Sequence, residues 1–173
     1  MIQDLRYKKY MSKGFTMIEL LLYMGIFSIL LVVLLDLLTM ILGVHTESQA
    51  TSAVDQDGNY IMTKLTYDIH RATTITPSTF AVPSNEMELT GTGFDETYAI
   101  DGNNNLVVTD NTVTPAVNYQ LNGPDTKASI SFTPYGNTGG KASVKIALIL
   151  TSRITQKGGV VQQQEFDTTV TMR

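Results

Sequence analysis

Cysteine is absent from this chain of 173 residues, which excludes disulfide bonds, a thiolate nucleophile and a cysteine-ligated metal site. Histidine is scarce, since His45 and His70 are the two present, and no G-x-S-x-G sequence occurs. His70 adjoins Arg71 at the end of a helical pattern, where cations are favoured by the helix dipole. We therefore expect no catalytic residues, no enzymatic activity and no cofactor.

Proline is missing before Pro77, and charged residues are missing from Leu20 to Leu35. Residues 1–14 carry a charge balance of +3, which leaves −7 on the rest of a chain whose net charge is −4. The charged residues of this basic stretch are Arg6, Lys8, Lys9 and Lys13 against Asp4. A mildly acidic body with no basic patch argues against nucleic acid as the main partner, so we expect no direct nucleic-acid site.

The uncharged stretch belongs to an apolar run from Phe15 to Leu35 in which Glu19 is the sole charge. About 20 such residues in a helix cross the hydrocarbon core of a membrane. A cleaved secretory signal peptide is the other interpretation, but its small-x-small candidate, residues 48–50, lies too far beyond the run. Residues 15–44 are therefore predicted to span the membrane. Basic residues before the span place the N-terminus in the cytoplasm and the rest of the chain outside.

The residues around Glu19 read "KGFTMIE", from Lys13 to Glu19. A basic residue and a glycine stand before an aromatic residue, and a glutamate is the fifth residue after the glycine. This arrangement resembles the type IV pilin family, which includes the pseudopilins of type II secretion systems and the competence pilins. The resemblance implies that a prepilin peptidase cuts between Gly14 and Phe15, removes the basic leader 1–14, and exposes Phe15 for N-methylation.

A carboxylate inside a membrane helix has a free-energy cost of about 2.5 to 3.5 kcal/mol at the membrane centre, so Glu19 needs a partner. Cleavage would create one, because it frees a positive amino group on Phe15, and Glu19 of the same or a neighbouring helix can neutralise it. The hypothesis is that Glu19 sets the axial register between subunits of a filament. The alternative is a carboxylate without a partner, favoured only by the positive end of the helix dipole.

Asp36 supports the membrane-spanning geometry. It lies 17 positions after Glu19, about 26 Å along a helix, so the two acids bracket a bilayer.

The subunit type is predicted from two further features. Many major pilins carry a proline near Asp36, whereas this chain has no proline before Pro77. The segments 65–77 and 166–173 resemble the corresponding segments of J-class minor pseudopilins and related minor pilins. The resemblance therefore favours a minor subunit.

The helix is expected to continue from about Thr16 to Ala72, with residues 45–76 as its amphipathic half. The apolar stripe that indicates this comprises Ala50, Val54, Ile61, Leu65, Ile69 and Ala72. Residues 77–173 then change to short β-type runs separated by turn sequences. These runs are 78–82, 86–91, 96–100, 105–109, 117–121, 128–132, 144–154 and 160–172, with 144–154 as the expected centre of the sheet.

The predicted fold class is α+β and pilin-like: a long N-terminal α-helix packed against a C-terminal antiparallel β-sheet domain. The sequence 55–59 contains a fragment of calcium-loop spacing, and the sequence 101–105 could bind calcium through Asp101 and asparagine carbonyls. The first lies within the helical stripe and lacks the glutamate at the twelfth position, and the second is more typical of a solvated turn. We expect no metal site.

Two functions remain open. The first is a minor structural subunit of a type IV pilus or type II secretion pseudopilus, which starts in the cytoplasmic membrane and ends in an extracytoplasmic filament or at the cell surface. The resemblance implies prepilin peptidase, other pilin or pseudopilin subunits, the inner-membrane assembly platform and membrane lipid as its partners. The alternative is a single-pass, membrane-anchored binding or adhesion domain outside any filament. Such a domain needs neither Gly14 nor Glu19.

Overall fold

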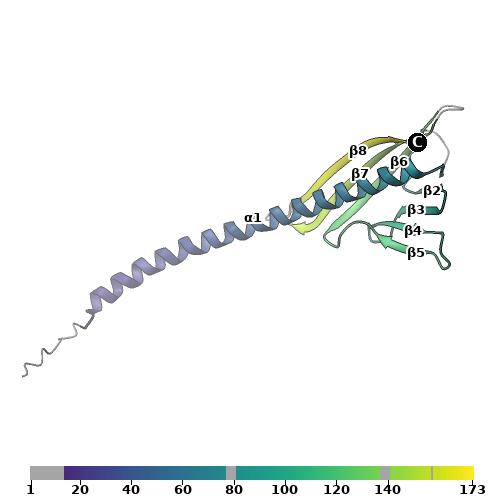
Figure 1. Ribbon diagram of the computed structural model, residues 1–173. Coiled ribbons are helices and arrows are strands. Elements are labelled where there is room, and N and C mark those ends of the chain that lie inside the picture. The colour runs from purple at the N-terminus through teal and green to yellow at the C-terminus, as the bar shows by residue number, and fades with distance from the viewer. Residues whose placement is uncertain (1–13, 77–80, 137–140, 157) are drawn as a thin grey trace, which may run out of the picture. The chain divides into compact units, whose positions relative to one another are not determined.

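The computed structural model describes residues 14–76, 81–136, 141–156 and 158–173, so most of the predicted leader lies outside the described residues. Within these ranges the chain forms one helix followed by eight strands (Figure 1). The chain divides into two compact units between Leu42 and Gly43. The elements are α1 (Met17–Arg71), β1 (Thr74–Thr76), β2 (Met87–Gly91), β3 (Phe94–Ile100), β4 (Leu106–Asp110), β5 (Val117–Gln120), β6 (Thr126–Tyr135), β7 (Ser143–Thr155) and β8 (Val161–Thr171).

The first unit contains the apolar part of α1. Every side chain of α1 in this unit is exposed except that of Glu19, which is partly exposed, and the helix is apolar and long enough there to cross a membrane. Of the 32 large apolar side chains that the described residues expose, 23 lie between Phe15 and Val44. An apolar surface of this extent requires lipid or other apolar helices around it.

In the second unit α1 becomes amphipathic, as predicted. Five of its apolar side chains are fully buried at spacings of four and seven residues: Ala50, Val54, Ile61, Leu65 and Ile69. The helix ends at Arg71, with two basic residues in its last turn that suit the negative end of its dipole. Residues 74–76, which the sequence prediction included in the helical half, form strand β1 instead, because Thr73 and Thr74 meet Thr90 of β2.

The strands form two antiparallel sheets, whereas the sequence prediction had one. Sheet A has the order β1-β2-β3-β4-β5, and sheet B has the order β6-β7-β8. The strands β5 and β6 are consecutive in the chain but do not pair with each other. The loop between them is fixed by hydrogen bonds of Asn122 to the start of β4 and the start of β6. Asn122 in this loop accepts a hydrogen bond from the Leu106 amide at 2.8 Å and donates one to the Thr126 carbonyl at 2.9 Å.

Strand β7 is the centre of sheet B, as the alternation of its residues predicted. Val144, Ile146, Leu148 and Leu150 are fully buried, and β7 pairs with β6 on one side and β8 on the other. Figure 1 shows the second half of α1 running alongside β8. The contact between Gly58 and Phe166 and the hydrogen bond between His70 and Thr171 join the two elements.

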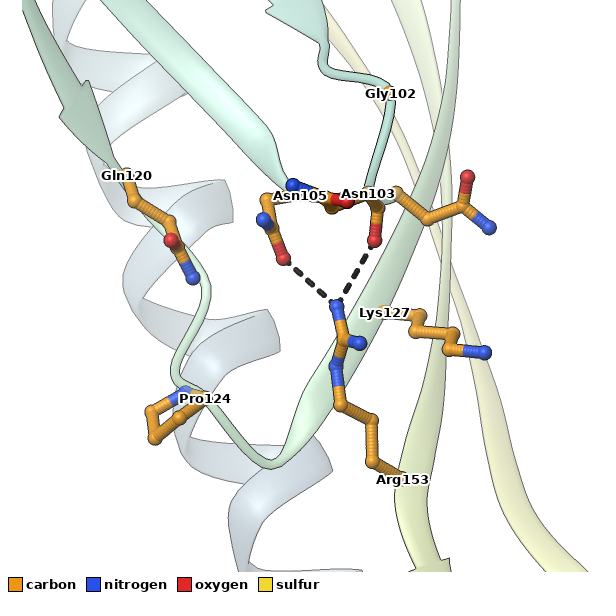
Figure 2. Close-up of a pocket in the computed structure, with 8 residues that line it drawn as sticks. Gly102, Asn103, Asn105, Gln120, Pro124, Lys127 and Arg153 are labelled. Atoms are coloured by element: carbon orange, nitrogen blue, oxygen red, sulfur yellow. Dashed lines mark hydrogen bonds between the residues drawn. The ribbon is translucent and has the colours of Figure 1, made fainter.

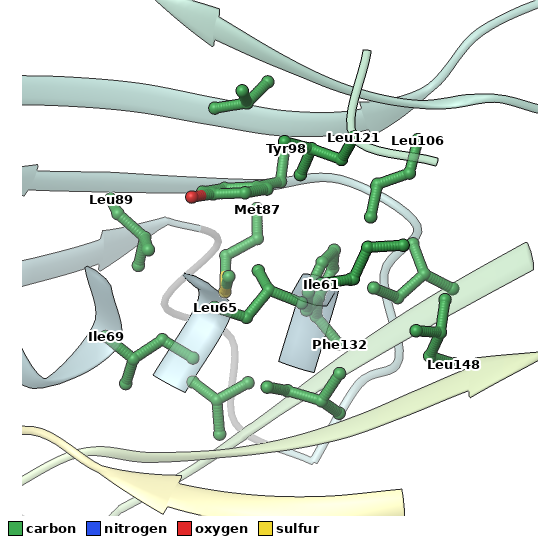
Figure 3. Packing of buried hydrophobic residues seen from close by; sticks show 14 of the residues in the cluster. Ile61, Leu65, Ile69, Met87, Leu89, Tyr98, Leu106, Leu121, Phe132 and Leu148 are labelled. Carbon is green, nitrogen blue, oxygen red and sulfur yellow. The ribbon is translucent and has the colours of Figure 1, made fainter. Parts of the chain in front are cut away.

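A single cluster of buried side chains joins the helix to both sheets (Figure 3). Ile61, Leu65 and Ile69 supply it from α1. Met87, Leu89, Tyr98 and Leu106 supply it from sheet A, and Phe132 and Leu148 from sheet B. The helix is thus part of the hydrophobic core rather than an attachment to it.

The strand predicted at residues 78–82 is absent from the two of its residues that the structure describes, Ala81 and Val82. Residues 78–80 lie outside the described residues, Ala81 adopts a turn with φ of 62°, and Val82 belongs to no strand. The predicted turn at 101–105 does join β3 to β4, which pair as a hairpin. The remaining predicted runs each overlap one observed strand.

Candidate functional site

Gly14 and Phe15, the residues predicted to flank the cleavage site, lie before the first turn of α1. Among the described residues, apart from Gly14 and its chain neighbours, no atom lies within 4 Å of the position that a Cβ on Gly14 would occupy, and Phe15 is 73% exposed. The peptide bond between them is therefore in an open, non-helical stretch of backbone, a conformation that a protease can bind.

Glu19 lies in the first turn of α1, and Thr16 is the residue that caps this turn. The Glu19 amide donates to Thr16 Oγ1 at 3.3 Å, and the Leu20 amide donates to the Thr16 carbonyl at 3.1 Å. "TMIE" is thus a capping-box sequence, with threonine at the N-cap and glutamate three positions later. The Glu19 carboxylate lies at the positive end of the helix dipole, where a negative charge is stabilised. Among the described residues it forms no salt bridge.

An apolar hollow of about 400 Å³ lies on the helix surface beside this turn. The rings of Phe15 and Tyr23 meet edge to face, with centroids 5.9 Å apart and an angle of 74° between planes. Leu20, Met24 and Phe27 complete the lining. The sequence analysis did not identify this surface, because Phe15 precedes the helix and no helical spacing relates it to Tyr23.

The hydroxyl groups of Ser28 and Thr39 within the apolar segment are satisfied by the helix itself. Ser28 donates to the Gly25 carbonyl at 2.8 Å, and Thr39 donates to the Asp36 carbonyl at 2.9 Å. A hydroxyl bonded to the preceding turn of its own helix does not need water, so the segment remains compatible with lipid. Asp36 is then the remaining charge within the span, 17 positions from Glu19.

The second unit contains a buried polar cluster that sequence reasoning missed. Asp68, which is 2% exposed, accepts hydrogen bonds from Tyr98 Oη at 2.5 Å and from Lys64 Nζ at 2.8 Å. Glu96 also accepts from both groups, at 3.0 and 3.3 Å. Arg71 lies 3.8 Å from Asp68 and stacks on the ring of Phe94 at 3.9 Å. These contacts tie the end of α1 to β3.

Both proton donors of the cluster titrate abnormally. Burial, followed by the hydrogen bond to Asp68 and the nearby negative charges, raises the pKa of the Tyr98 hydroxyl far above its ordinary value. Burial lowers the pKa of Lys64, but the hydrogen bonds and charges of Asp68 and Glu96 outweigh it, so that the net change raises this pKa. The cluster therefore holds a neutral tyrosine and a charged lysine beside Asp68 and Glu96, and its hydrogen bonds link α1 to β3.

The other candidates from the sequence have structural contacts. His70 Nδ1 lies 2.9 Å from the Thr171 carbonyl, and Asp57 accepts a hydrogen bond from the Gly123 amide at 2.7 Å. Asp101 accepts from the amides of Asn103 and Asn105, and these bonds, with that of Asn105 the strongest, lower its pKa. The described residues contain no group of three or more metal-ligating side chains.

Comparison with known proteins identifies the N-terminal segment. Residues 9–35 match the family of the prokaryotic N-terminal methylation motif. The matched range contains Gly14, Phe15 and Glu19, the three residues singled out from the sequence. No curated protein and no solved structure matches the chain.

Proposed function

Because its methylation motif and its helix-and-sheet layout are those of a type IV pilin-like protein, we propose that the chain is a subunit of a type IV filament. The filament is a pilus or a type II secretion pseudopilus. The subunit is inserted in the cytoplasmic membrane with its N-terminus inside, cleaved after Gly14, N-methylated on Phe15 and assembled through its apolar helix. Proteins with this motif are generally structural rather than enzymatic.

One observation carries the proposal: a single helix has two halves of opposite character. The half within residues 17–42 exposes apolar side chains on every face, and the half within Gly43–Arg71 buries one stripe under two sheets. A lipid anchor alone would account for the first half. The methylation motif favours a filament subunit over a simple lipid anchor, because proteins with this motif are processed at the start of the apolar half.

The geometry at Glu19 supports its assembly role. The Thr16 cap and the helix dipole stabilise the carboxylate at the helix start, but an added positive group would stabilise it further as helices leave lipid and pack together. Cleavage after Gly14 supplies this group as the amine of Phe15. Pairing between the amine of one subunit and Glu19 of its neighbour would fix their axial offset.

We assign the chain to the minor subunits, which start or cap a filament. The absence of proline before Pro77 and the J-class resemblance of residues 65–77 and 166–173 support this assignment. Its partners are prepilin peptidase, the other pilin or pseudopilin subunits and the inner-membrane assembly platform. Lipid surrounds the helix before assembly, and the filament neighbours replace lipid afterwards.

The decisive experiment replaces Glu19 by leucine. Glu19→Leu should be cleaved and should remain in the membrane, because a carboxylate has been removed from the apolar segment. Its incorporation into sheared filaments or overexpressed pseudopili should fall about tenfold or more, as expected from the loss of a charge-assisted pair. Quantitative immunoblotting of the sheared fraction measures this.

Glu47→Leu is the matched control, because Glu47 is an exposed glutamate of the same helix beyond the apolar run. It should assemble as the wild type does. Wild-type incorporation of Glu19→Leu would disprove the register role. If the chain is never found in any filament fraction, it is instead a membrane-anchored binding domain.

A further inference from the structure

A polar hollow of about 550 Å³ lies where the two sheets of the second unit meet (Figure 2). The β3–β4 turn forms one wall, the end of β5 and the loop after it form another, and the adjoining ends of β6 and β7 close it. The lining residues are Gly102, Asn103, Asn104, Asn105, Gln120, Pro124, Lys127 and Arg153. A volume of about 300 to 1,000 Å³ is typical of small-molecule sites.

The side chains that line the hollow are of two kinds, cationic and amide. It contains two cations, Lys127 and Arg153, and four amide side chains, but no carboxylate and no aromatic ring. Neither cation forms a salt bridge with any residue that the structure describes. The carboxylate of Asp101, at the start of the β3–β4 turn, partly offsets the charge of Arg153, which helps to lower the pKa of Asp101. The positive charge of the hollow therefore rests chiefly on Lys127, in a domain whose overall charge is negative.

The guanidinium of Arg153 is held in place by neutral acceptors. Its Nε donates to the Thr126 carbonyl at 2.9 Å, and one Nη donates to the Asn103 carbonyl at 3.0 Å and to Asn105 Oδ1 at 2.9 Å. Asn105 is itself fixed, because its Nδ2 donates to Asp101 Oδ2 at 3.0 Å. Figure 2 shows the two bonds from this Nη to Asn103 and Asn105. The other Nη has no hydrogen-bond partner among the described residues and remains available to a ligand.

We propose that this hollow binds an acidic sugar, with the carboxylate of the sugar on Lys127 and the Arg153 guanidinium and its hydroxyls on the amide side chains. An amide both donates and accepts hydrogen bonds, as a sugar hydroxyl does, so that Asn103, Asn104 and Gln120 match a hydroxylated ring. A preorganised arginine is well suited to a carboxylate.

Two other anions fit less well. Single-stranded nucleic acid is bound by stacking its bases on aromatic rings and by extended positive charge, and the lining has no ring and the domain is acidic. Inorganic phosphate would meet the cations but would leave the amide side chains without partners, in a hollow much larger than the ion.

The test uses the purified full-length chain in detergent micelles, titrated with sodium glucuronate, glucose and inorganic phosphate and followed by isothermal calorimetry. Glucuronate should bind saturably, and glucose and phosphate should each bind about tenfold more weakly, because each lacks one half of the recognised chemistry. Lys127→Gln should weaken glucuronate binding about tenfold, since it removes a charged hydrogen-bond donor. Lys127 is the residue to change because Arg153 also links β7 of sheet B to the β3–β4 turn of sheet A through Asn103 and Asn105.

Lys141→Gln is the matched control, an exposed lysine that does not line the hollow, and it should bind glucuronate as the wild type does. Circular dichroism should show the same fold for both variants. The proposal is overturned if glucuronate does not bind saturably or if Lys127→Gln binds it with wild-type affinity. Equal affinity for phosphate or for glucose would also overturn it, as would Lys127-dependent binding of a single-stranded oligonucleotide tighter than that of glucuronate.

Discussion

The ring of Phe166 on β8 lies directly against Gly58 of α1. A Cβ added at position 58 would come closer than 3.0 Å to three atoms of this ring, a separation that real side chains do not adopt. Glycine normally weakens a helix interior, but here its missing side chain makes room for an aromatic ring that holds β8 to the helix.

Gly58→Ala should therefore destabilise the folded domain. Alanine would gain about 1 kcal/mol of helix propensity, but displacing the Phe166 ring should cost about 1 to 3 kcal/mol, so the free energy of unfolding should fall by up to about 2 kcal/mol. Urea unfolding followed by circular dichroism measures this. Asn59→Ala, at the exposed neighbouring position, should leave stability unchanged or raise it slightly.

The double variant Gly58→Ala with Phe166→Leu identifies the cause. If the ring clash is responsible, the smaller leucine relieves it, and the double variant should lose less stability than the sum of the two single changes. Additive losses would mean that Gly58 matters for another reason.

Tyr98→Phe should reduce stability at neutral pH by about 1 to 3 kcal/mol, because it leaves the buried Asp68 carboxylate without one of its donors. It should also change the alkaline limb of the stability profile. Because the pKa of Tyr98 is raised in the folded state, its contribution to the free energy of unfolding is complete below pH 10.0, the ordinary tyrosine value. This contribution is lost as pH rises further, since the unfolded chain then releases a proton that the folded chain retains.

Urea unfolding at neutral pH and at several pH values above 10.0 tests this sign. The wild type should lose stability with pH more steeply than Tyr98→Phe does. Lys64 contributes a loss in the same direction above its ordinary value of 10.5, and it does so in both proteins. Parallel alkaline profiles for the two proteins would contradict the role given to Tyr98.

Gly14→Leu should leave the chain inserted but uncut, because a peptidase that recognises glycine must admit a residue with no side chain beside the scissile bond. In the part of the chain that the structure describes, no residue beyond the chain neighbours contacts the Cβ position of Gly14, so the change should not disturb the helix. Intact-mass spectrometry of the membrane fraction should find the leader retained. A mutant chain that begins with Phe15 would refute the assignment of the cleavage site.

A soluble fragment from Thr46 to Arg173 should fold by itself, because it retains all the buried residues of α1 and both sheets. A shorter fragment from Pro77 loses Ile61, Leu65 and Ile69, each fully buried, at about 1.5 to 3 kcal/mol apiece. This loss is comparable with the whole stability of a typical domain, about 5 to 15 kcal/mol. Thermal melts by circular dichroism compare the two, and equal, cooperative melting would show that the helix is not part of the core.

The sequence alone determined the parts of this protein whose pattern is local. A run without charge from Leu20 to Leu35 permits only a lipid or helix-bundle environment, and residues 50–72 carry a helical period that the burial of α1 reproduces. The alternation in β7 likewise predicted a central strand. Thr16 and Glu19 lie three positions apart, so the capping of the first turn was also present in the sequence, although it was recognised only from the hydrogen bond.

Only the tertiary structure decided which distant residues meet. Glycine normally weakens a helix interior, and only the structure places Phe166, more than one hundred positions later, against Gly58. Asp68 is an aspartate of the helix, a residue type that is mostly exposed, yet the fold buries it and Tyr98 of β3 donates a hydrogen bond to it. The loop at Asn122 separates the two sheets, because the Asn122 side chain bonds to Leu106 of sheet A and to Thr126 of sheet B. The polar hollow with Lys127 and Arg153 lies where these sheets meet. Local periodicity specifies elements, but strand pairing and buried polar contacts depend on loop closure between positions that no local pattern relates.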